Sequence, residues 1–274
     1  MRIAVAQFTS TPNVRSNLDV CVEFIQDARE SGASLVVFPE ASLCPPPGEF
    51  DPAAVAEPID GPFVAGLRTA ARDNAIGVVV GTFTPGPEGR PYNTVVAIGD
   101  DGSLMGRYDK LHLYDAFNVQ ESKQITPGPH PDSRGELLTF QVGDITFGVA
   151  TCYDLRFPEL FRALIDTGVQ AIILPAAWMT GSYKEVHWKT LTAARAIENT
   201  VYVIAANQGP FWSVGNSSII DPVGRVVAQA GDKPELITAV VDAEEVRLAR
   251  RLNPSVNNRR FHVQLRNNPL IQPT

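Results

Sequence analysis

The sequence contains few cysteines and no apolar run long enough to cross a membrane. Only three of its 274 residues are cysteines, and their wide spacing cannot form a disulfide framework, which is typical of a protein from a reducing cytosol. The longest apolar stretch, residues 171–179, is too short for a transmembrane helix. The apolar run at the start breaks at Gln7, before it could serve as a signal peptide. We therefore expect a cytoplasmic protein.

Positive charge is also scarce. Lysine and arginine number 23 against 30 aspartate and glutamate residues, which gives a net charge of −7, and no block of like charges forms a charged tail. Nucleic acids and anionic membranes favour a concentrated positive patch, so neither is expected as a partner. Apolar residues make up 44% of the chain and charged residues 19%, as in an ordinary globular protein rather than a disordered one.

Motifs for common cofactors are missing as well. The sequence has no GxxxxGK(S/T) loop for nucleotide phosphates, no GxGxxG turn between a strand and a helix, no CxxC pair and no HExxH. The histidines are scattered without the spacing of zinc ligands. We expect neither a cofactor nor a metal, so any chemistry would depend on a nucleophilic side chain.

What the sequence does contain is an alternation of short β-branched runs with amphipathic segments. The runs predict strands at residues 3–8, 35–38, 77–83, 94–98, 104–108, 137–140, 145–150, 171–174, 201–206, 217–220, 225–228 and 236–241. Apolar residues at helical spacing predict helices at residues 13–31, 62–74, 159–166, 184–198 and 243–252. This alternation is typical of an α/β fold. Turn signals at residues 99–102 and 221–224 add antiparallel hairpins, which indicates mixed sheets.

The two halves of the chain repeat one order of elements. RIAVAQF pairs with ITFGVAT, SLVVFPEA with AIILPAA, IGVVVGTF with VYVIAANQ, and VVAIGDDGSLMGRY with SSIIDPVGRVVAQ. The shared order predicts a pseudo-twofold, four-layer αββα sandwich of two mixed sheets with a site between the halves, although chance echoes are an alternative. No segment resembles an interdomain linker, so residues 1–274 are expected to form a single domain. Its polar tail, from about residue 251, would be disordered or lie on a partner subunit.

Cys152 is the strongest candidate for a nucleophile. It follows the apolar run ITFGVA and precedes the helix-forming stretch LRFPELFRALI. A thiol at such a strand-to-helix turn would be exposed, and the N–H groups of a helix N-terminus would stabilise a thiolate and a developing oxyanion. By position alone, a lone cysteine beside a core strand is more often a packing residue. Cys21, on an apolar helix face, and Cys44, in a proline-rich loop, are expected to have no catalytic role.

Three charged residues could complete a site around this thiol. Glu40 ends the apolar run SLVVFP, where burial would raise the pKa of the carboxyl group toward the value that suits a general base near neutral pH, unless the side chain turns to solvent. Lys110 follows the predicted strand LMGRY and would supply a fixed positive charge for an oxyanion, although a solvated lysine is the simpler interpretation. Glu121, in NVQESKQ, is the weakest candidate because loop glutamates are commonly solvated.

Together, these residues and their surroundings resemble the nitrilase superfamily of carbon-nitrogen hydrolases over nearly the whole chain. The Glu-Lys-Cys triad of that family matches Glu40 in VVFPEA, Lys110 in GRYDKLHL and Cys152 in TCYDLRFPEL, and a second family glutamate matches Glu121 in FNVQES. LPAAW, LTAARAIENTVYVIAANQ and GNSSIIDPVGRV are also similar to the family. KLHLYDAFNVQES and CYDLRFPELFR most resemble the Nit-type amidases, which include omega-amidases and deaminated-glutathione amidases. The resemblance implies the αββα sandwich, commonly assembled as a homodimer.

The resemblance also implies hydrolysis of a primary amide through a thioester. Glu40 would take the thiol proton, and Cys152 would attack the amide carbon. Lys110 and the backbone N–H of Tyr153 would hold the oxyanion. Ammonia would then leave, and water would hydrolyse the thioester. Glu121 would orient the lysine or the substrate amide.

Substrate choice is expected to come from residues at the rim of the site. Phe117, Trp178 and Met179 could close over an acyl chain, with ordinary packing as the alternative for the aromatic residues. Arg156 and Arg195 could attract a substrate carboxylate, or pair with acidic residues of the fold. These residues favour a small, carboxylated, linear amide as the substrate.

Two other functions stay open at this point. An N-carbamoyl amide hydrolase would use the same triad and would release carbon dioxide as well as ammonia. A non-catalytic interaction module could keep the fold without the activity, although the presence of all four polar residues of the site argues against it.

Overall fold

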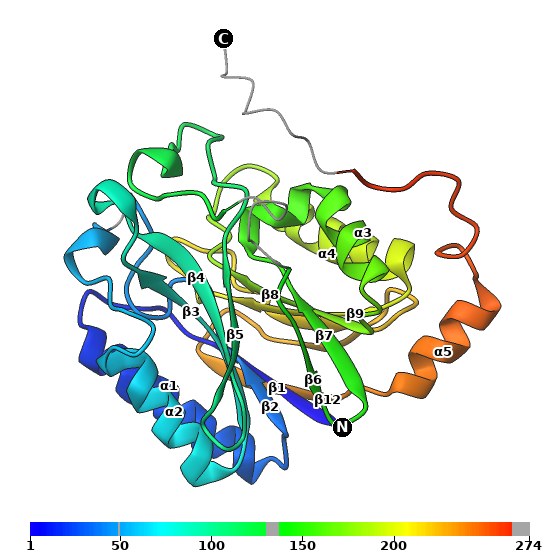
Figure 1. Ribbon diagram of the computed structural model, residues 1–274, viewed down its shortest axis with the longest axis horizontal. Coiled ribbons are helices and arrows are strands. Elements are labelled where there is room, and N and C mark those ends of the chain that lie inside the picture. Colours follow the sequence, from blue (N-terminus) through cyan, green and yellow to red (C-terminus); the bar gives the residue numbers. More distant parts are fainter. Residues whose placement is uncertain (49, 130–136, 265–274) are drawn as a thin grey trace.

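Two six-stranded sheets lie face to face, with helices on their outer faces (Figure 1). The computed structural model describes residues 1–48, 50–129 and 137–264. The first sheet has the order β12-β1-β2-β3-β4-β5 and the second the order β11-β10-β9-β8-β7-β6. In each sheet the three consecutive strands that helices connect are parallel, and the other strands are antiparallel to their neighbours. Both sheets are therefore mixed, as the hairpin signals predicted.

The predicted strands and helices are all present, with boundaries that shift by a residue or two. The first sheet consists of β1 (Arg2–Gln7), β2 (Leu35–Val37), β3 (Gly77–Thr84), β4 (Tyr92–Ile98), β5 (Leu104–Asp109) and β12 (Glu235–Val240). The second consists of β6 (Thr139–Val142), β7 (Ile145–Val149), β8 (Ala171–Ala176), β9 (Tyr202–Asn207), β10 (Ser218–Ile220) and β11 (Val226–Gln229). The helices are α1 (Val14–Glu30), α2 (Pro62–Asn74), α3 (Pro158–Asp166), α4 (Lys184–Asn199) and α5 (Ala243–Leu252). Within the described residues, no helix is both long and apolar enough to cross a membrane.

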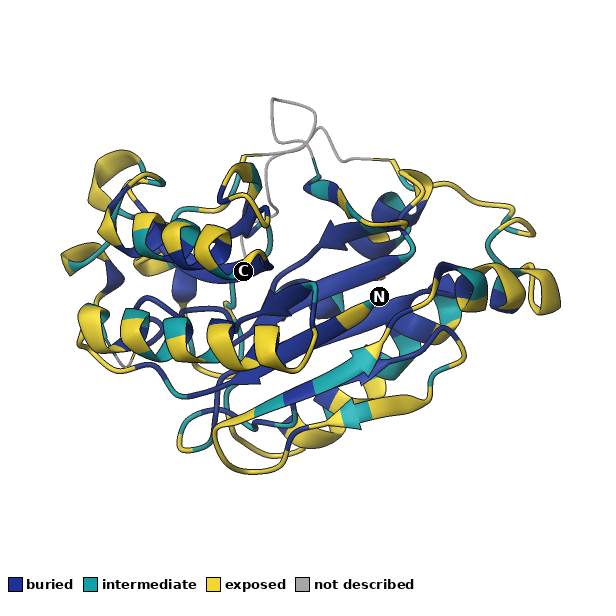
Figure 2. Ribbon diagram, turned by 90° about the horizontal axis from the view of Figure 1, so that it is seen from below, coloured by how far each residue is buried: buried dark blue, intermediate teal, exposed yellow. Residues whose placement is uncertain are grey.

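Local sequence signals explain where the helices begin and which face they bury. The side chain of Asn13 caps α1 by accepting a hydrogen bond from the Ser16 N–H, 3.1 Å away. The same helix buries Cys21, Ile25 and Ala28, which share one side at helical spacing. The outer faces of the helices are exposed, whereas the strands are largely buried (Figure 2). The buried faces of α1 to α4 are therefore the faces that pack against the sheets.

Three apolar layers hold the sandwich together. The central layer, which includes Val5, Val37, Phe147 and Ile173, joins the inner faces of the two sheets. A second layer packs α1 and α2 on the first sheet, and a third packs α3 and α4 on the second sheet. Burial of this kind contributes about 25 cal/mol per Å² of apolar surface, so the three layers dominate the folding energy.

The internal repeat is present in the strand order. Strands β1 to β5 correspond in sequence to β7 to β11, and β12 and β6 occupy equivalent edges beside β1 and β7. The predicted αββα sandwich is therefore confirmed. The internal repeat matches β2 with β8, and the ends of these two strands meet between the two sheets. There the N–H of Ala177, after β8, donates to the carboxylate of Glu40, after β2.

Candidate active site

The four residues of the predicted site line one pocket, although they come from distant parts of the chain. Glu40 follows β2, Lys110 follows β5, Glu121 lies in the connection after β5, and Cys152 follows β7. The remaining lining residues are small or apolar apart from one tyrosine: Pro46, Pro47, Tyr114, Val119, Ala177 and Met179. The first half of the chain thus contributes the charged groups, and the second half contributes the thiol.

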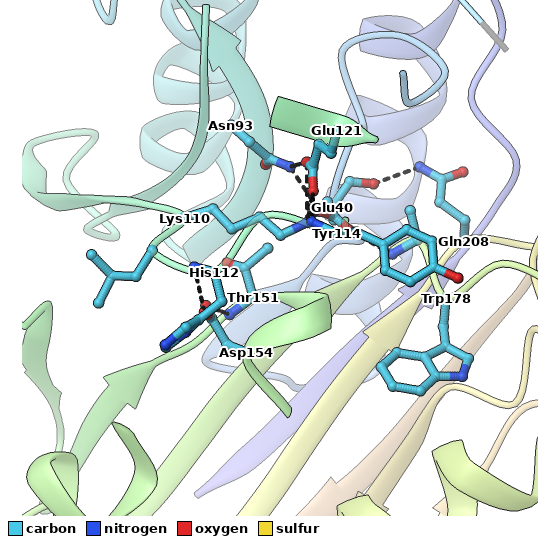
Figure 3. A network of polar contacts seen from close by, with 12 residues as sticks. Glu40, Asn93, Lys110, His112, Tyr114, Glu121, Thr151, Asp154, Trp178 and Gln208 are labelled. Atoms are coloured by element: carbon cyan, nitrogen blue, oxygen red, sulfur yellow. Dashed lines mark hydrogen bonds and ion pairs between the residues drawn. The ribbon is translucent and has the colours of Figure 1, made fainter. Parts of the chain in front are cut away.

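Lys110 is held between two carboxylates (Figure 3). Its Nζ lies 2.8 Å from Oε1 of Glu40 and 2.9 Å from Oε2 of Glu121, and all three side chains are buried. Burial alone would lower the pKa of Lys110, but the charges of Glu121 and Glu40 outweigh it and raise the pKa well above its ordinary value. The lysine therefore keeps its positive charge throughout the neutral range.

Glu40 is oriented by donors from both halves of the chain. Its Oε1 accepts a hydrogen bond from Nδ2 of Asn93, 2.7 Å away, in addition to the lysine contact. Its Oε2 accepts the N–H of Ala177 at 2.7 Å. The side chain of Gln208 fixes the backbone by donating to the carbonyl of Glu40 at 2.8 Å (Figure 3). These contacts direct the carboxylate into the pocket rather than to solvent.

The backbone beneath Glu40 requires a glycine in the neighbouring strand. A Cβ at Gly81 of β3 would lie 2.5 Å from the Cα of Glu40, which is closer than real Cβ contacts. Ala41, the next residue, has a φ of 59°. Such strained backbone persists only where the surrounding structure enforces it, and it gathers at functional sites.

Cys152 lies at a sharp turn, but its surroundings differ from those expected. Its φ is 45°, and only a five-residue 3₁₀ turn, Cys152–Arg156, follows it before α3 begins at Pro158. The thiol is buried, with 7% of the residue exposed. Burial and then the negative charge of Glu40 raise the pKa of Cys152 well above its ordinary value, against a smaller lowering by Lys110. The prediction of an exposed thiol is therefore wrong, because the cysteine is buried, and the α-helix expected to start here begins only at Pro158.

A buried aspartate links the segment around the lysine to the turn that carries the thiol. Asp154 accepts hydrogen bonds from the Thr151 N–H at 2.9 Å and the His112 N–H at 3.1 Å (Figure 3). It also accepts one from the Tyr108 hydroxyl at 2.7 Å. Nδ1 of His112 also lies 2.7 Å from Oδ1 of this carboxylate. Tyr108 and His112 flank Lys110 in sequence, and Thr151 precedes Cys152. The carboxylate of Asp154 therefore holds the segment that carries the lysine against the turn that carries the thiol.

The predicted rim residues gather on one side of the pocket, with one exception. The guanidinium of Arg156 lies 4.8 Å from the ring centre of Trp178 and 5.4 Å from that of Phe117. Met179 lines the pocket itself. Arg195 does not reach the site, because its guanidinium donates to the Leu155 carbonyl at 2.6 Å and is paired with a glutamate of its own helix. Its suggested role in binding a substrate is therefore wrong.

Tyr153 and Trp178 occupy different positions relative to the pocket. The ring of Tyr153 packs against Tyr114, with ring centres 5.2 Å apart. Trp178 is buried, and its indole N–H donates to the Lys184 carbonyl at 2.9 Å. Tyr153 thus packs against a residue that lines the pocket, whereas the ring of Trp178 lies beneath the guanidinium of Arg156.

Several contributors to the site had no clear signal in the sequence. Asn93 donates to both Glu40 and Glu121, at 2.7 and 3.2 Å, although a lone asparagine at the start of a strand is unremarkable in sequence. The backbone N–H of Ala177, which donates to Glu40, had no signal in the sequence either. Burial raises the pKa of both other cysteines, Cys21 and Cys44, as expected of packing residues. Among the described residues, no group of three histidine, cysteine, aspartate or glutamate side chains is placed to hold a metal ion.

Comparison with known proteins agrees with this geometry. A family model described as carbon-nitrogen hydrolase matches residues 2–251. The chain is 40% identical to a deaminated glutathione amidase of Escherichia coli O157:H7, over 95% of this chain and 98% of that protein. It is 32% identical to an omega-amidase of Xenopus tropicalis, over 94% of this chain and 95% of that one. A solved structure of an amidase variant from Nesterenkonia sp. AN1, with the acetamide moiety of fluoroacetamide covalently added at its active-site cysteine, matches with a TM-score of 0.80 at 27% identity, covering 95% of this chain and 94% of that one. The chain therefore belongs to the carbon-nitrogen hydrolase family.

Proposed function

We propose that this protein is a cysteine-dependent amidase that cleaves the C–N bond of a small linear amide to release an acid and ammonia. The observation that carries the proposal is that Cys152 shares one buried pocket with Glu40 and with a lysine clamped by two carboxylates. Family membership supports the reaction class, and two of the relatives are named as amidases. The covalent adduct at the cysteine of the Nesterenkonia amidase supports a covalent route.

Acylation begins with a neutral thiol and a charged carboxylate. Oε2 of Glu40 accepts only the Ala177 N–H among the described groups, so it is the oxygen free to take the proton of Cys152. The sulfur attacks the amide carbon as this proton moves, and the negative charge that builds on the amide oxygen is held by Nζ of Lys110 and the N–H of Tyr153. The protonated Glu40 then gives its proton to the departing nitrogen, which leaves ammonia and a thioester.

Deacylation reuses the same groups. Glu40 takes a proton from a water molecule, the resulting hydroxide attacks the thioester carbon, and the lysine again stabilises the oxyanion. The C–S bond breaks, Cys152 regains a proton from Glu40, and the acid leaves. Glu121 acts by positioning, since its carboxylate is held by the Tyr114 N–H at 2.6 Å and in turn fixes the lysine.

We propose further that the acyl chain of the substrate carries a carboxylate, and that Arg156 is one of its ligands. Phe117, Trp178 and Met179 would contact the chain between this carboxylate and the amide. The arginine lies beside Phe117 and Trp178, and among the described residues its polar contact is with His187 rather than with a carboxylate. Arginine is well suited to a carboxylate because its planar fork of N–H groups matches two oxygens.

A panel of amides tests the proposed reaction. The enzyme is incubated separately with glutaramate, deaminated glutathione and an N-carbamoyl amino acid. For each compound we measure the acid that forms, the ammonia or amine that is released, and carbon dioxide. We expect glutaramate to give acid and ammonia in equal amounts without carbon dioxide. Carbon dioxide from the carbamoyl compound alone would instead support the N-carbamoyl hydrolase, and no product from any of the three would support a non-catalytic module.

We also propose that the protein is a cytoplasmic homodimer. Edge strand β11 exposes Val226 and Val227, and the chain from the end of α5 onward exposes Leu252 and Phe261. Exposed apolar side chains of this kind are typical of a surface that a partner subunit covers. The last ten residues of the tail, 265–274, lie outside the described residues. Sedimentation equilibrium is expected to give twice the chain mass of 29.7 kDa, and a single-chain mass would contradict the dimer.

A further inference from the structure

One backbone N–H after β8 acts on both the base and the nucleophile. The N–H of Ala177 donates to Oε2 of Glu40 at 2.7 Å, and both residues line the same pocket as Cys152. Burial raises the pKa of the Cys152 thiol, whereas a hydrogen bond from this same N–H lowers it. A single backbone donor therefore serves the two atoms between which the thiol proton moves.

The end of β9 fixes this donor on both sides. The N–H of Gln208 donates to the carbonyl of Ala176 at 2.9 Å, and that carbonyl belongs to the same peptide group as the Ala177 N–H. On the other side, the N–H of Trp178 donates to Oδ1 of Asn207, also at 2.9 Å. A hydrogen bond to the carbonyl polarises a peptide group and strengthens its N–H as a donor. The donor is thus directed before any substrate binds.

The same strand end also holds the base. The side chain of Gln208, which is fully buried, donates to the carbonyl of Glu40 at 2.8 Å (Figure 3). It donates as well to the carbonyl of Ala41 at 3.1 Å, and its Oε1 accepts the Ser10 N–H at 2.9 Å. The base and the peptide donor therefore share one support, so the fold rather than the substrate sets their separation.

The carboxylate depends on this N–H less than a thiolate would. Glu40 also accepts Nδ2 of Asn93 at 2.7 Å and Nζ of Lys110 at 2.8 Å. A thiolate at Cys152 would be favoured by the charge of Lys110 and by the hydrogen bond from Ala177. Charge on a buried sulfur is costly unless a donor meets it. Loss of the N–H would thus weaken the thiolate more than the carboxylate, which keeps its other two donors.

We propose that the N–H of Ala177 is a catalytic donor that follows the negative charge from Glu40 to Cys152 during acylation. This inference rests on the proposed amidase function and adds a group to its first step. As the S–H bond breaks and the proton joins Oε2, the carboxyl group becomes neutral and needs the N–H less. The N–H then donates to the sulfur, which holds the charge until its bond to the amide carbon forms.

A backbone ester removes this N–H and little else. Lactic acid incorporated in place of Ala177 keeps the methyl side chain and the planar linkage, but an oxygen replaces the N–H. Ala230 is the matched control for the same replacement, because it is buried, its N–H donates to the Ser217 carbonyl at 2.8 Å, and it does not line the pocket. Each ester loses one backbone hydrogen bond, and thermal melting verifies that both chains fold.

Alkylation of Cys152 by iodoacetamide tests the donor without an oxyanion. The reagent reacts with the thiolate, and no charge develops on an amide oxygen. We expect the ester at position 177 to slow alkylation about 10-fold at neutral pH, the lower end of the range for losing a hydrogen bond to a charged group. The value of kcat/KM for glutaramate, which reports acylation, should fall by a similar factor. The ester at position 230 should match the wild-type enzyme in both measurements.

The direction of the change distinguishes this role from simple support of the base. If the N–H served only the carboxylate of Glu40, its loss would let that carboxylate take the thiol proton more readily, and alkylation would become faster. Faster or unchanged alkylation in the ester at position 177 would therefore overturn the proposal, even if hydrolysis fell. If the wild-type enzyme hydrolyses no amide but the ester still slows alkylation, the amidase function fails while the effect of the donor on Cys152 stands.

Discussion

Replacing Cys152 by alanine is expected to abolish amide hydrolysis while leaving the fold intact. Without the sulfur no thioester forms, and the loss of a nucleophile that acts together with its base has cost about 10⁶-fold in kcat in a comparable hydrolase. The fold should tolerate the change, because alanine and cysteine meet the same backbone strain at a φ of 45°. Product formation from glutaramate and thermal melting measure the two properties separately.

A second cysteine provides the control for this experiment. Cys44 is buried and its thiol pKa is raised to about 12, but it does not line the pocket. Cys44→Ala should therefore retain wild-type kcat, even if the small cavity lowers the melting temperature. Substantial activity in Cys152→Ala with a native melting profile would refute the thioester route.

Lys110→Met is expected to lower both activity and stability. Removing one donor to a developing oxyanion typically costs about 100- to 1,000-fold in turnover. The same change leaves Glu40 and Glu121 buried without their cation, and breaking a buried ion pair in this way costs about 3–5 kcal/mol of unfolding free energy. Steady-state kinetics and urea unfolding measure the two losses, with the exposed Lys123→Met as the control.

The stability loss in Lys110→Met should depend on pH. In the wild-type protein the raised pKa of Lys110 stabilises the fold fully below the ordinary value of 10.5, and this contribution is lost only as the pH rises through the folded-state value. In the variant, one of the two carboxylates must take up a proton to relieve their repulsion, which is easier in acid. The destabilisation should therefore be larger at pH 8 than at pH 5, and equal losses at both values would contradict this account of the buried cluster.

The layers of the fold could be predicted because they depend on local pattern. The apolar spacing in α1 and the continuous apolar runs of β1, β2 and β8 are visible in sequence, and the repeated order of elements places them in two equivalent sheets. Glu40, Lys110 and Cys152 could be found because each follows a strand and carries a recognisable neighbourhood. Their convergence then follows from the pairing of the two halves.

The remaining parts of the site depend on contacts between distant segments. Asn93 acquires its role only because β4 pairs with β5 and its side chain reaches Glu40, which follows β2, past the intervening β3. Lys184 begins a helix, a position that in sequence suggests a solvated side chain. The exposed position of Cys152 was predicted incorrectly because a helix start was assumed, whereas the thiol is buried and its raised pKa agrees with the expectation that Glu40 takes its proton. Polar groups inside a protein respond to three-dimensional neighbours that sequence spacing does not reveal.

The pairing of β12 with β1 has a consequence for the order in which the protein is made. Arg2 in β1 lies opposite Val240 in β12, and the amino group of Met1 donates to the Val241 carbonyl at 2.8 Å. A ribosome therefore synthesises nearly the whole chain before the first strand receives this neighbour. Until then the emerging chain exposes an unpaired strand edge, which favours association with other chains. Such distant pairing also slows folding, so protection of the nascent first half by chaperones would help this architecture more than one built from neighbouring strands.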